Sequence, residues 1–442
     1  MTIKLTRGLD LTLPGAPEQV IGPCPDVSHV ALLGADYPDL RPALAVSEGE
    51  RVRLGQALFT DRRHPEIRYT APAAGRVLAI NRGARRKLSS LVMELDGEEA
   101  EAYPAHEPAR LASLAPQTVR DALLRSGLWT SFRSRPYNTI PPPDRFPGAL
   151  FINAMDTNPL AADPSVVLAA RAEDFRHGVT AVSRLATGTT YVCKSPATPL
   201  EPPGADGVVV AEFEGPHPAG LAGTHMHYLR ARPGETERWH VGYQDVIAIG
   251  RLLATGQLWR DRIVAVGGPG ISNPRLLRAP VGASLVELLA GELAPGCRLI
   301  SGSVLSGRKA TPPDAYLGRY HQQVTAVPEY YARSRSGQAG SRLLSALIPR
   351  RPEVIPPQPT TAVNGWPAGM LPVEDFERVW PLRTPPLPLL RALLVRDTET
   401  AVALGCLDLD EEDLALCSFV CPAKHDYGSA LRATLRECER SG

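Results

Sequence analysis

Two cysteines near the C-terminus have a spacing that could serve metal or cluster chemistry. They lie in DLALCSFVCPAKHDYG, residues 413–428, where Cys417 and Cys421 are separated by three residues and Pro422 follows directly. A cubane cluster needs four thiolates, and a Cys-Pro pair closes ferredoxin-type cluster loops. This segment supplies two thiols, which a helix would carry on one face. Two interpretations stay open: the pair belongs to a zinc or partial-cluster site, or both thiols pack as small buried hydrophobes.

Three histidines and a glycine group form weaker patterns. His217, His225 and His227 lie in EGPHPAGLAGTHMHYL, and on a strand the last two would point to one side as a metal edge. No carboxylate or cysteine completes that set at a recognisable spacing, and the nearby glycines favour a tight turn. The group GGPG, residues 267–270, is only a weak phosphate-binding signal, because proline interrupts the fingerprint of a dinucleotide site.

The stretch LWTSFRSRPYNTIPPP combines rings with guanidinium groups. Its aromatic residues are Trp129, Phe132 and Tyr137, and its basic residues are Arg133 and Arg135. Rings can stack on a planar apolar ligand while arginines donate hydrogen bonds to its carbonyl oxygens. The alternative interpretation is a loop whose aromatic side chains anchor it on another domain.

Composition limits the kinds of protein that could carry these residues. The chain has 442 residues, 43% of them hydrophobic and 21% charged, with a net charge of +1. That length predicts several domains, and the balanced charge argues against a nucleic-acid partner. No apolar run reaches the roughly 20 residues of a membrane span, and the seven cysteines do not suggest a disulfide framework. We therefore expect a cytoplasmic protein with reduced thiols.

Short strands separated by glycines predict an all-β module near the N-terminus. Residues 46–80 resemble biotinyl and lipoyl domains, in which a hairpin tip carries a modifiable lysine. Residues 61–66 at this tip read DRRHPE and contain no lysine, which excludes a swinging cofactor arm. We expect an unmodified barrel-sandwich domain.

The middle of the chain alternates strands with helices. A helix is predicted from Pro116 to Gly127, strands at 148–155, 189–195 and 207–213, and helical structure from Ser165 to about Ala186. This alternation indicates an α/β domain with a parallel sheet.

Two further modules follow. Strand, helix and strand between residues 262 and 303 fit a β-grasp domain, with Ser284 and Glu287 in a capping-box arrangement. From about residue 376 the chain is predicted to be helical, with Asp397 as a cap, Gly405 at a helix end, and a closing helix that has Leu431, Leu435 and Cys438 on one face. Proline-rich stretches at 136–148 and 348–359 are predicted connectors.

Four segments together resemble one protein family. They are GLDLTLPGAPEQVI, SGLWTSFRSRP, FEGPHPAGLAGTHMHYL and LGCLDLDEEDLALCSFVCPAKHDYG, and the likeness runs from residue 8 to about residue 436. In this order they resemble the A subunit of the bacterial sodium-translocating NADH:quinone reductase. That family is also similar to the C subunit of the Rnf complex and to the flavin subunit of respiratory complex I.

The resemblance implies a fold and a function. The family is part of a six-subunit inner-membrane complex that passes electrons from NADH to ubiquinone and exports Na+. The A subunit is implied to be peripheral, on the cytoplasmic side, and bound to the membrane-embedded B subunit near the quinone end of the path. Binding of NADH, FAD, FMN, riboflavin and iron–sulfur centres belongs to other subunits. We therefore expect an isolated chain that is inactive and holds no cofactor, with the quinone near Trp129, Phe132, Arg133, Arg135 and Tyr137.

Departures from the relatives sharpen this expectation. Where they have a glycine-rich GGAGFPT loop for flavin phosphate, residues 131–137 of this chain read SFRSRPY, whose side chains would fill that space. Cys417 and Cys421 are then remnants of a cluster motif. The family segment RAMVP.G.YE corresponds to NGWPAGMLPVEDF at 364–376, which lacks the basic residue and the tyrosine.

The predicted architecture has four domains. They are a barrel-sandwich domain at 1–110, a Rossmann-like α/β domain at 111–257, a β-grasp domain of the SLBB type at 258–330, and a proline-rich linker with a helical domain at 331–442. Two other functions stay open. One is a stand-alone flavin-binding oxidoreductase, and the other is an iron–sulfur or zinc electron-transfer protein. Bound flavin or metal in the purified chain would favour one of these.

Overall fold

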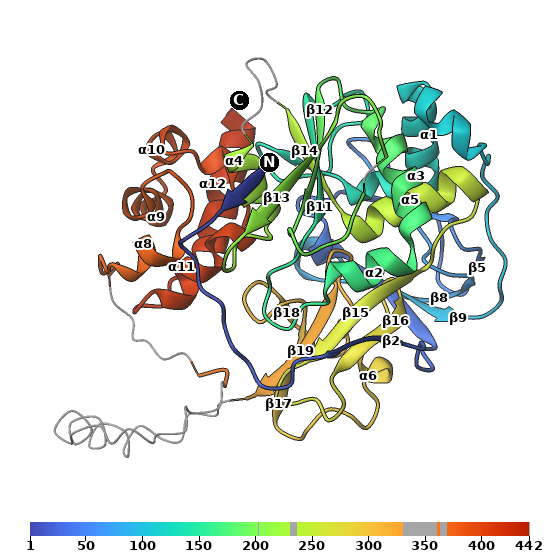
Figure 1. The fold of residues 1–442 in the computed structure, drawn as a ribbon. Coiled ribbons are helices and arrows are strands. Elements are labelled where there is room, and N and C mark those ends of the chain that lie inside the picture. The colour runs from blue at the N-terminus through green and yellow to red at the C-terminus, as the bar shows by residue number, and fades with distance from the viewer. Residues whose placement is uncertain (202, 230–236, 330–359, 363–368, 442) are drawn as a thin grey trace.

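The protein consists of β, α/β and helical parts arranged around one central parallel sheet (Figure 1). The computed structural model describes residues 1–201, 203–229, 237–329, 360–362 and 369–441. The predicted connector at 348–359 lies outside these residues, and so do residues 364–368 of the segment that differs from the family pattern. Within the described ranges, no helix is both long and apolar enough to cross a bilayer.

Two small sheets form the predicted barrel-sandwich domain. The hairpin tip at residues 61–66, which contains no lysine, lies between β6(Ala57–Asp61) and β7(Arg68–Thr70). Leu58, Phe59, Val77 and Met93 fill the space between the sheets and are fully buried. One sheet has the order β3(His29–Leu33), β9(Leu88–Leu95), β8(Gly75–Arg82), β5(Arg51–Val52), and the other β4(Pro42–Leu44), β6(Ala57–Asp61), β7(Arg68–Thr70).

A six-stranded sheet forms the centre of the α/β domain. All neighbouring strands are parallel except the edge strand β10, which is antiparallel to β14. The strand interiors are apolar, as expected for a sheet covered on both faces. The order is β1(Thr2–Lys4), β13(Val208–Glu214), β12(Thr189–Lys194), β11(Ala149–Ala154), β14(Arg238–Gly242), β10(Arg133–Arg135).

The first helix of this domain begins and ends where the sequence predicts. Helix α1(Pro116–Ser126) starts with proline, whose missing N–H needs no partner there, and ends at Gly127 with φ +80°. The helical run predicted from Ser165 is two helices, α2(Pro164–Ala170) and α3(Ala172–Ser183), separated at Arg171. The remaining helices are α4(Ala222–Tyr228) and α5(Tyr243–Thr255).

The β-grasp domain is a mixed sheet with one short helix. Ser284 caps α6(Leu285–Leu288) through its hydroxyl, as predicted. The Glu287 carboxylate does not complete the capping box, because it binds Ser28 and His29 of the barrel-sandwich domain instead. The sheet order is β18(Arg308–Lys309), β17(Cys297–Ser301), β19(Gln323–Pro328), β15(Asp261–Gly267), β16(Arg275–Pro280), β2(Glu18–Gly22).

The first 22 residues tie two domains together. Strand β1 pairs with β13 of the α/β sheet, whereas β2 pairs with β16 of the β-grasp sheet. Figure 1 shows this segment as a blue strand and loop running from one sheet to the other. The segment therefore contributes to two sheets outside the barrel-sandwich domain.

The C-terminal domain has its own core of leucines and aromatics. Asp397 caps α10 by accepting a hydrogen bond from the Thr400 N–H, and Gly405 has φ +90°, as predicted. On the last helix, Leu431 and Leu435 are fully buried and Cys438 is partly buried. The helices are α8(Asp375–Val379), α9(Pro386–Val395), α10(Thr398–Ala403), α11(Ala415–Val420) and α12(Tyr427–Ser441).

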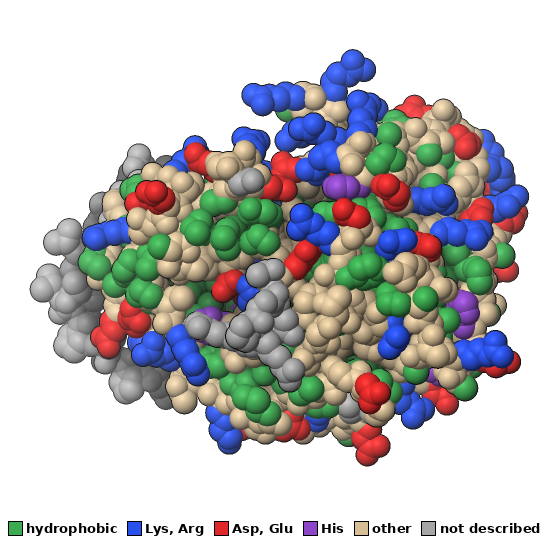
Figure 2. All heavy atoms as spheres, turned by 90° about the horizontal axis from the view of Figure 1, so that it is seen from above, with side chains coloured by type: hydrophobic (Ala, Val, Ile, Leu, Met, Phe, Trp, Pro, Cys, Tyr) green, Lys and Arg blue, Asp and Glu red, His purple; other side chains and the backbone are tan. Residues whose placement is uncertain are grey.

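Charges of both signs are distributed over the surface. On the face seen in Figure 2, Lys and Arg side chains are interspersed with Asp and Glu side chains over most of the area, with one basic group at the upper edge. This agrees with the net charge of +1.

Candidate functional site

The carboxyl ends of β11 and β14 form the natural binding position of the α/β sheet. Strand β11 has β12, the next parallel strand along the chain, on one side and β14 on the other. The strand order reverses at this point, and ligands of open α/β sheets bind in the crevice beside such a reversal. Residues Met155 and Asp156 follow β11, and Tyr243 and Asp245 open helix α5 after β14.

A cavity of about 200 Å³ lies at this position. Three domains contribute to its wall. The α/β domain supplies the strand ends, the β-grasp domain supplies the loop from Arg319 to Gln323, and the helical domain supplies Glu412 from an acidic loop. The cavity is therefore assembled only when the domains pack together.

A buried ion cluster forms one side of the cavity. Oδ1 of Asp245 accepts hydrogen bonds from Arg262, from Arg319 at 2.8 Å and from the Ser131 hydroxyl at 3.0 Å. Burial would raise the pKa of Asp245, but the charges of Arg262 and Arg319 outweigh it and lower the pKa to about 2. This carboxylate is ionised at neutral pH, and two guanidinium groups share it.

Burial shifts the pKa of several other ionisable groups of the cavity. Burial and the charge of Arg135 hold the pKa of His240 well below its ordinary value, and burial lowers the pKa of His321 to about 4. Burial raises the pKa of Asp156. Burial, together with the charges of Asp410 and Asp413, raises the pKa of Glu412 well above its ordinary value.

The predicted aromatic residues support the wall from behind. Trp129 and Phe132 have no exposed surface, and their rings pack against Trp239 at centroid distances of 5.3 and 5.6 Å. The Trp129 indole donates a hydrogen bond to the Pro141 carbonyl at 2.9 Å. These rings anchor the loop in the core of its own α/β domain, not on another domain.

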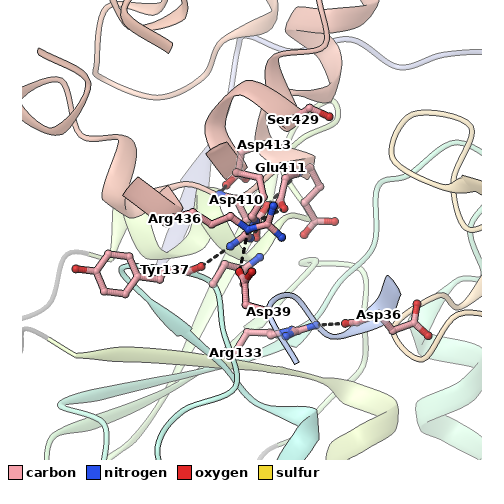
Figure 3. Close-up of polar contacts among 12 residues, drawn as sticks. Asp36, Asp39, Arg133, Tyr137, Asp410, Glu411, Asp413, Ser429 and Arg436 are labelled. Carbon is pink, nitrogen blue, oxygen red and sulfur yellow. Dashed lines mark hydrogen bonds and ion pairs between the residues drawn. The ribbon is translucent and has the colours of Figure 1, made fainter. Parts of the chain in front are cut away.

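Arg133 is the predicted residue that lines the cavity. Its guanidinium lies 4.0 Å from the centre of the Tyr320 ring and donates to the backbone oxygen of Asp36 at 2.8 Å. Figure 3 shows Arg133 directed toward Asp36. Within the described residues no carboxylate forms an ion pair with Arg133, so this buried cation can act on a ligand.

Arg135 and Tyr137 connect the loop to the helical domain. The Arg135 guanidinium is fully buried and binds Asp410 at 2.6 Å, with Asp413 at 4.0 Å. The Tyr137 carbonyl accepts a hydrogen bond from Arg432 at 2.8 Å. Figure 3 shows Tyr137 near Asp410 and Asp413 of the helical domain. These two residues thus hold the helical domain against the cavity.

A larger groove adjoins the cavity. It has a volume of about 740 Å³, and Met155, Asp156 and Asn158 line both spaces. Leu11, Leu13, Leu160, Ala162, Pro164 and Phe213 give the groove an apolar lining. A polar cavity that continues into an apolar groove suits a ligand with a polar head and a long hydrocarbon chain.

The cysteine pair is buried in the helical domain. Cys417 lies in α11 and Cys421 follows its last residue, and both are fully buried. Among the described residues, no group of three or more His, Cys, Asp or Glu side chains is placed to hold a metal ion. The arrangement supports the interpretation that these thiols pack as hydrophobes.

The histidine pair does not lie on a strand, so the metal edge that a strand would have formed is absent among the described residues. His225 and His227 lie in helix α4, where residues two apart point in different directions. The His225 ring packs 4.2 Å from Phe213, and burial lowers its pKa to about 4. His227 accepts a hydrogen bond from the Arg383 N–H at 2.9 Å.

Sequence reasoning missed most of the cavity. Asp156, His240, Asp245, Arg319 and Glu412 are distant in sequence and have no common spacing. One local signal was available for Asp156, which begins the polar turn DTNP directly after a buried strand. Arg319 and Glu412 join the cavity only through the packing of separate domains, whereas His240 and Asp245 lie in the same α/β domain as Asp156.

These features define a multidomain α/β protein with a ligand cavity at the carboxyl edge of its parallel sheet. Three family models match it in order along the chain. The NqrA N-terminal barrel-sandwich hybrid domain matches residues 3–96, the NqrA second alpha/beta domain 114–258, and the NQRA C-terminal domain 263–312.

Curated relatives match over the whole length. The A subunit of the Na(+)-translocating NADH-quinone reductase from Pseudomonas aeruginosa strain UCBPP-PA14 is 48% identical, with 100% of both chains covered. The protein of the same name from Marinomonas sp. strain MWYL1 is 46% identical over 99% of this chain and 100% of its own. The chain belongs to the family of A subunits of the Na+-translocating NADH-quinone reductases, which are oxidoreductase complexes.

Proposed function

We propose that this chain is a peripheral subunit on the cytoplasmic side of the inner membrane, bound to the membrane-embedded B subunit, and that it contributes to the ubiquinone site. The observation that carries the proposal is the polar cavity and the apolar groove that adjoins it through Met155, Asp156 and Asn158. The quinone ring would lie in the cavity and its isoprenoid chain in the groove. Family membership supports a role within a complex that couples NADH oxidation and quinone reduction to Na+ export.

The residues of the loop then have different tasks. Arg133 would donate a hydrogen bond to a quinone carbonyl, because its guanidinium lines the cavity. Trp129 and Phe132 would keep the loop in place, and Arg135 and Tyr137 would hold the helical domain against it.

We also propose that the chain binds no flavin or cluster of its own. In residues 131–137 Phe132 and Arg135 are fully buried, so their side chains occupy space that a glycine loop would leave to a phosphate. Flavin that stays bound to the purified chain at near one per chain would contradict this and favour a stand-alone flavoenzyme.

Photoaffinity labelling of the intact complex tests the quinone assignment. A ubiquinone analogue with its reactive group on the ring should label residues 131–135 or 155–158, and one with the group on the tail should label residues 160–165. An excess of ubiquinone should suppress both. Labelling confined to the B subunit would overturn the assignment.

A further inference from the structure

Two carboxyl groups face the cavity without a cationic partner. Asp156 follows β11, and Glu412 belongs to the acidic loop of the helical domain, so they reach the cavity from different domains. We propose that Asp156 and Glu412 supply the protons taken up when a quinone is reduced in this cavity, an inference that rests on the proposed function. No sequence pattern marks Glu412, and only the polar turn DTNP marks Asp156.

The cations around the cavity are bound to other carboxylates. Arg262 and Arg319 share Asp245, and Arg135 binds Asp410. Within the described part of the chain, neither Asp156 nor Glu412 forms an ion pair within 4.0 Å.

Hydrogen bonds leave both carboxyl groups available. Oδ1 of Asp156 accepts from the Asn158 backbone at 2.8 Å and from its side chain at 3.0 Å. Among the described residues, no donor reaches the Glu412 carboxyl group. A partly buried carboxyl group with no compensating cation holds its proton more tightly than one in water.

The other titratable groups of the cavity are unsuited to this task. Asp245 holds no proton at neutral pH, because its pKa is about 2. His240 and His321 are neutral, since burial lowers the pKa of both. Burial raises the pKa of Tyr243 and Tyr320, so their hydroxyls are poor proton donors. Arginine side chains are not acids near neutral pH in proteins generally.

The reaction balances with one proton from each carboxyl group. Two electrons from NADH oxidation arrive through the complex, and each quinone carbonyl oxygen gains a proton to become a hydroxyl of the quinol. Asp156 and Glu412 are left as carboxylates and recover protons from water. Asp156 also lines the adjoining groove, which gives it a route to solvent.

The test uses the intact complex with Glu412→Gln and Asp156→Asn, which keep the side-chain size. Glu399→Gln, an exposed residue of α10, is the matched control. Positioned general acids contribute about 100-fold or more to a rate. We expect each cavity variant to reduce quinone turnover by about that factor, with little change in the KM for quinone and normal NADH oxidation by an artificial acceptor. The control should behave as the natural chain.

Infrared spectroscopy provides a readout that does not depend on turnover. The carbonyl stretch of a protonated carboxylic acid should be present in the full natural chain at neutral pH and should weaken in each cavity variant but not in Glu399→Gln. Absence of that band would overturn the inference even if a variant failed to assemble.

The outcomes separate the two proposals. If ubiquinone analogues label the cavity but Glu412→Gln and Asp156→Asn turn over within twofold of the natural complex, proton donation is overturned while the quinone site stands. If labelling falls only on the B subunit, the quinone site is overturned and proton donation with it.

Discussion

Nη2 of Arg135 lies 2.6 Å from Oδ2 of Asp410, and both side chains are buried. Arg135 is on the edge strand β10 of the α/β sheet, whereas Asp410 is in the acidic loop that precedes α11. The pair therefore joins two domains beside the cavity, because Glu412 of the same loop lines its wall. An arginine that the sequence suggested as a ligand contact is an interdomain contact.

Removal of one partner of this pair should be costly. We expect Asp410→Ala to destabilise the contact by about 3–5 kcal/mol, because it leaves a buried guanidinium without its main counter-charge. Hydrogen exchange should report faster opening of α11 and α12. Asp375→Ala, which breaks the exposed pair with Arg378, is the control and should change little. Equal effects of both variants would contradict the role of the buried pair.

The ion pairs of Asp245 should make the stability of the protein sensitive to acid. Its folded pKa of about 2 lies below its ordinary value, so its contribution to stability is complete above about pH 4 and is lost as the pH falls toward 2. The contribution is about 2 kcal/mol. Unfolding measured from pH 6 to pH 2 should show this loss in the natural chain, and Asp245→Asn should be less stable at pH 6 with a flatter acid limb. A variant with an unchanged acid limb would exclude this assignment.

Trp129 should matter for stability more than for ligand contact. Replacement by alanine removes a fully buried ring and its hydrogen bond to Pro141, and we expect a loss of about 3–5 kcal/mol. Thermal unfolding of Trp129→Ala and of the milder Trp129→Phe would measure it. A large rise in the KM for quinone with unchanged stability would instead indicate that the ring touches the ligand.

Cys417 and Cys421 should react slowly with thiol reagents in the folded protein. Burial raises the pKa of Cys417 to about 12, so its thiolate is scarce at neutral pH. Alkylation followed by mass spectrometry should modify exposed Cys24 long before Cys417 or Cys421, and all three at similar rates after denaturation. The double variant Cys417→Ser and Cys421→Ser should leave the iron and zinc content of the complex unchanged. Loss of iron would mean that the pair is a working ligand set.

Local signals in the sequence predicted the kinds of domain correctly. Glycine-separated strands indicated the barrel-sandwich, and Pro116 and Gly127 marked the ends of α1, because these features act within a few residues. The Ser284 cap was also local, but the partners of Glu287 were not, since Ser28 and His29 lie more than 250 residues away.

The site could not be predicted in the same way. The aromatic and arginine residues between positions 129 and 137 indicated an important loop. In the structure Trp129 and Phe132 are buried in the core, and Arg133 is the one of the five predicted residues that lines the cavity. Asp245 and Glu412 gain their properties from the charges and burial that other domains provide. The spacing of residues in the sequence does not predict such long-range effects.

Strands β1 and β2 have partners that come much later in the chain. Thr2 pairs with Glu212 and Glu18 with Arg275, so both strands must wait until partner strands that lie far along the chain have been made. Closing such long loops is slow compared with forming local structure. The segment that carries β1 and β2 is therefore fixed later during synthesis than the local structure that lies between it and its partners.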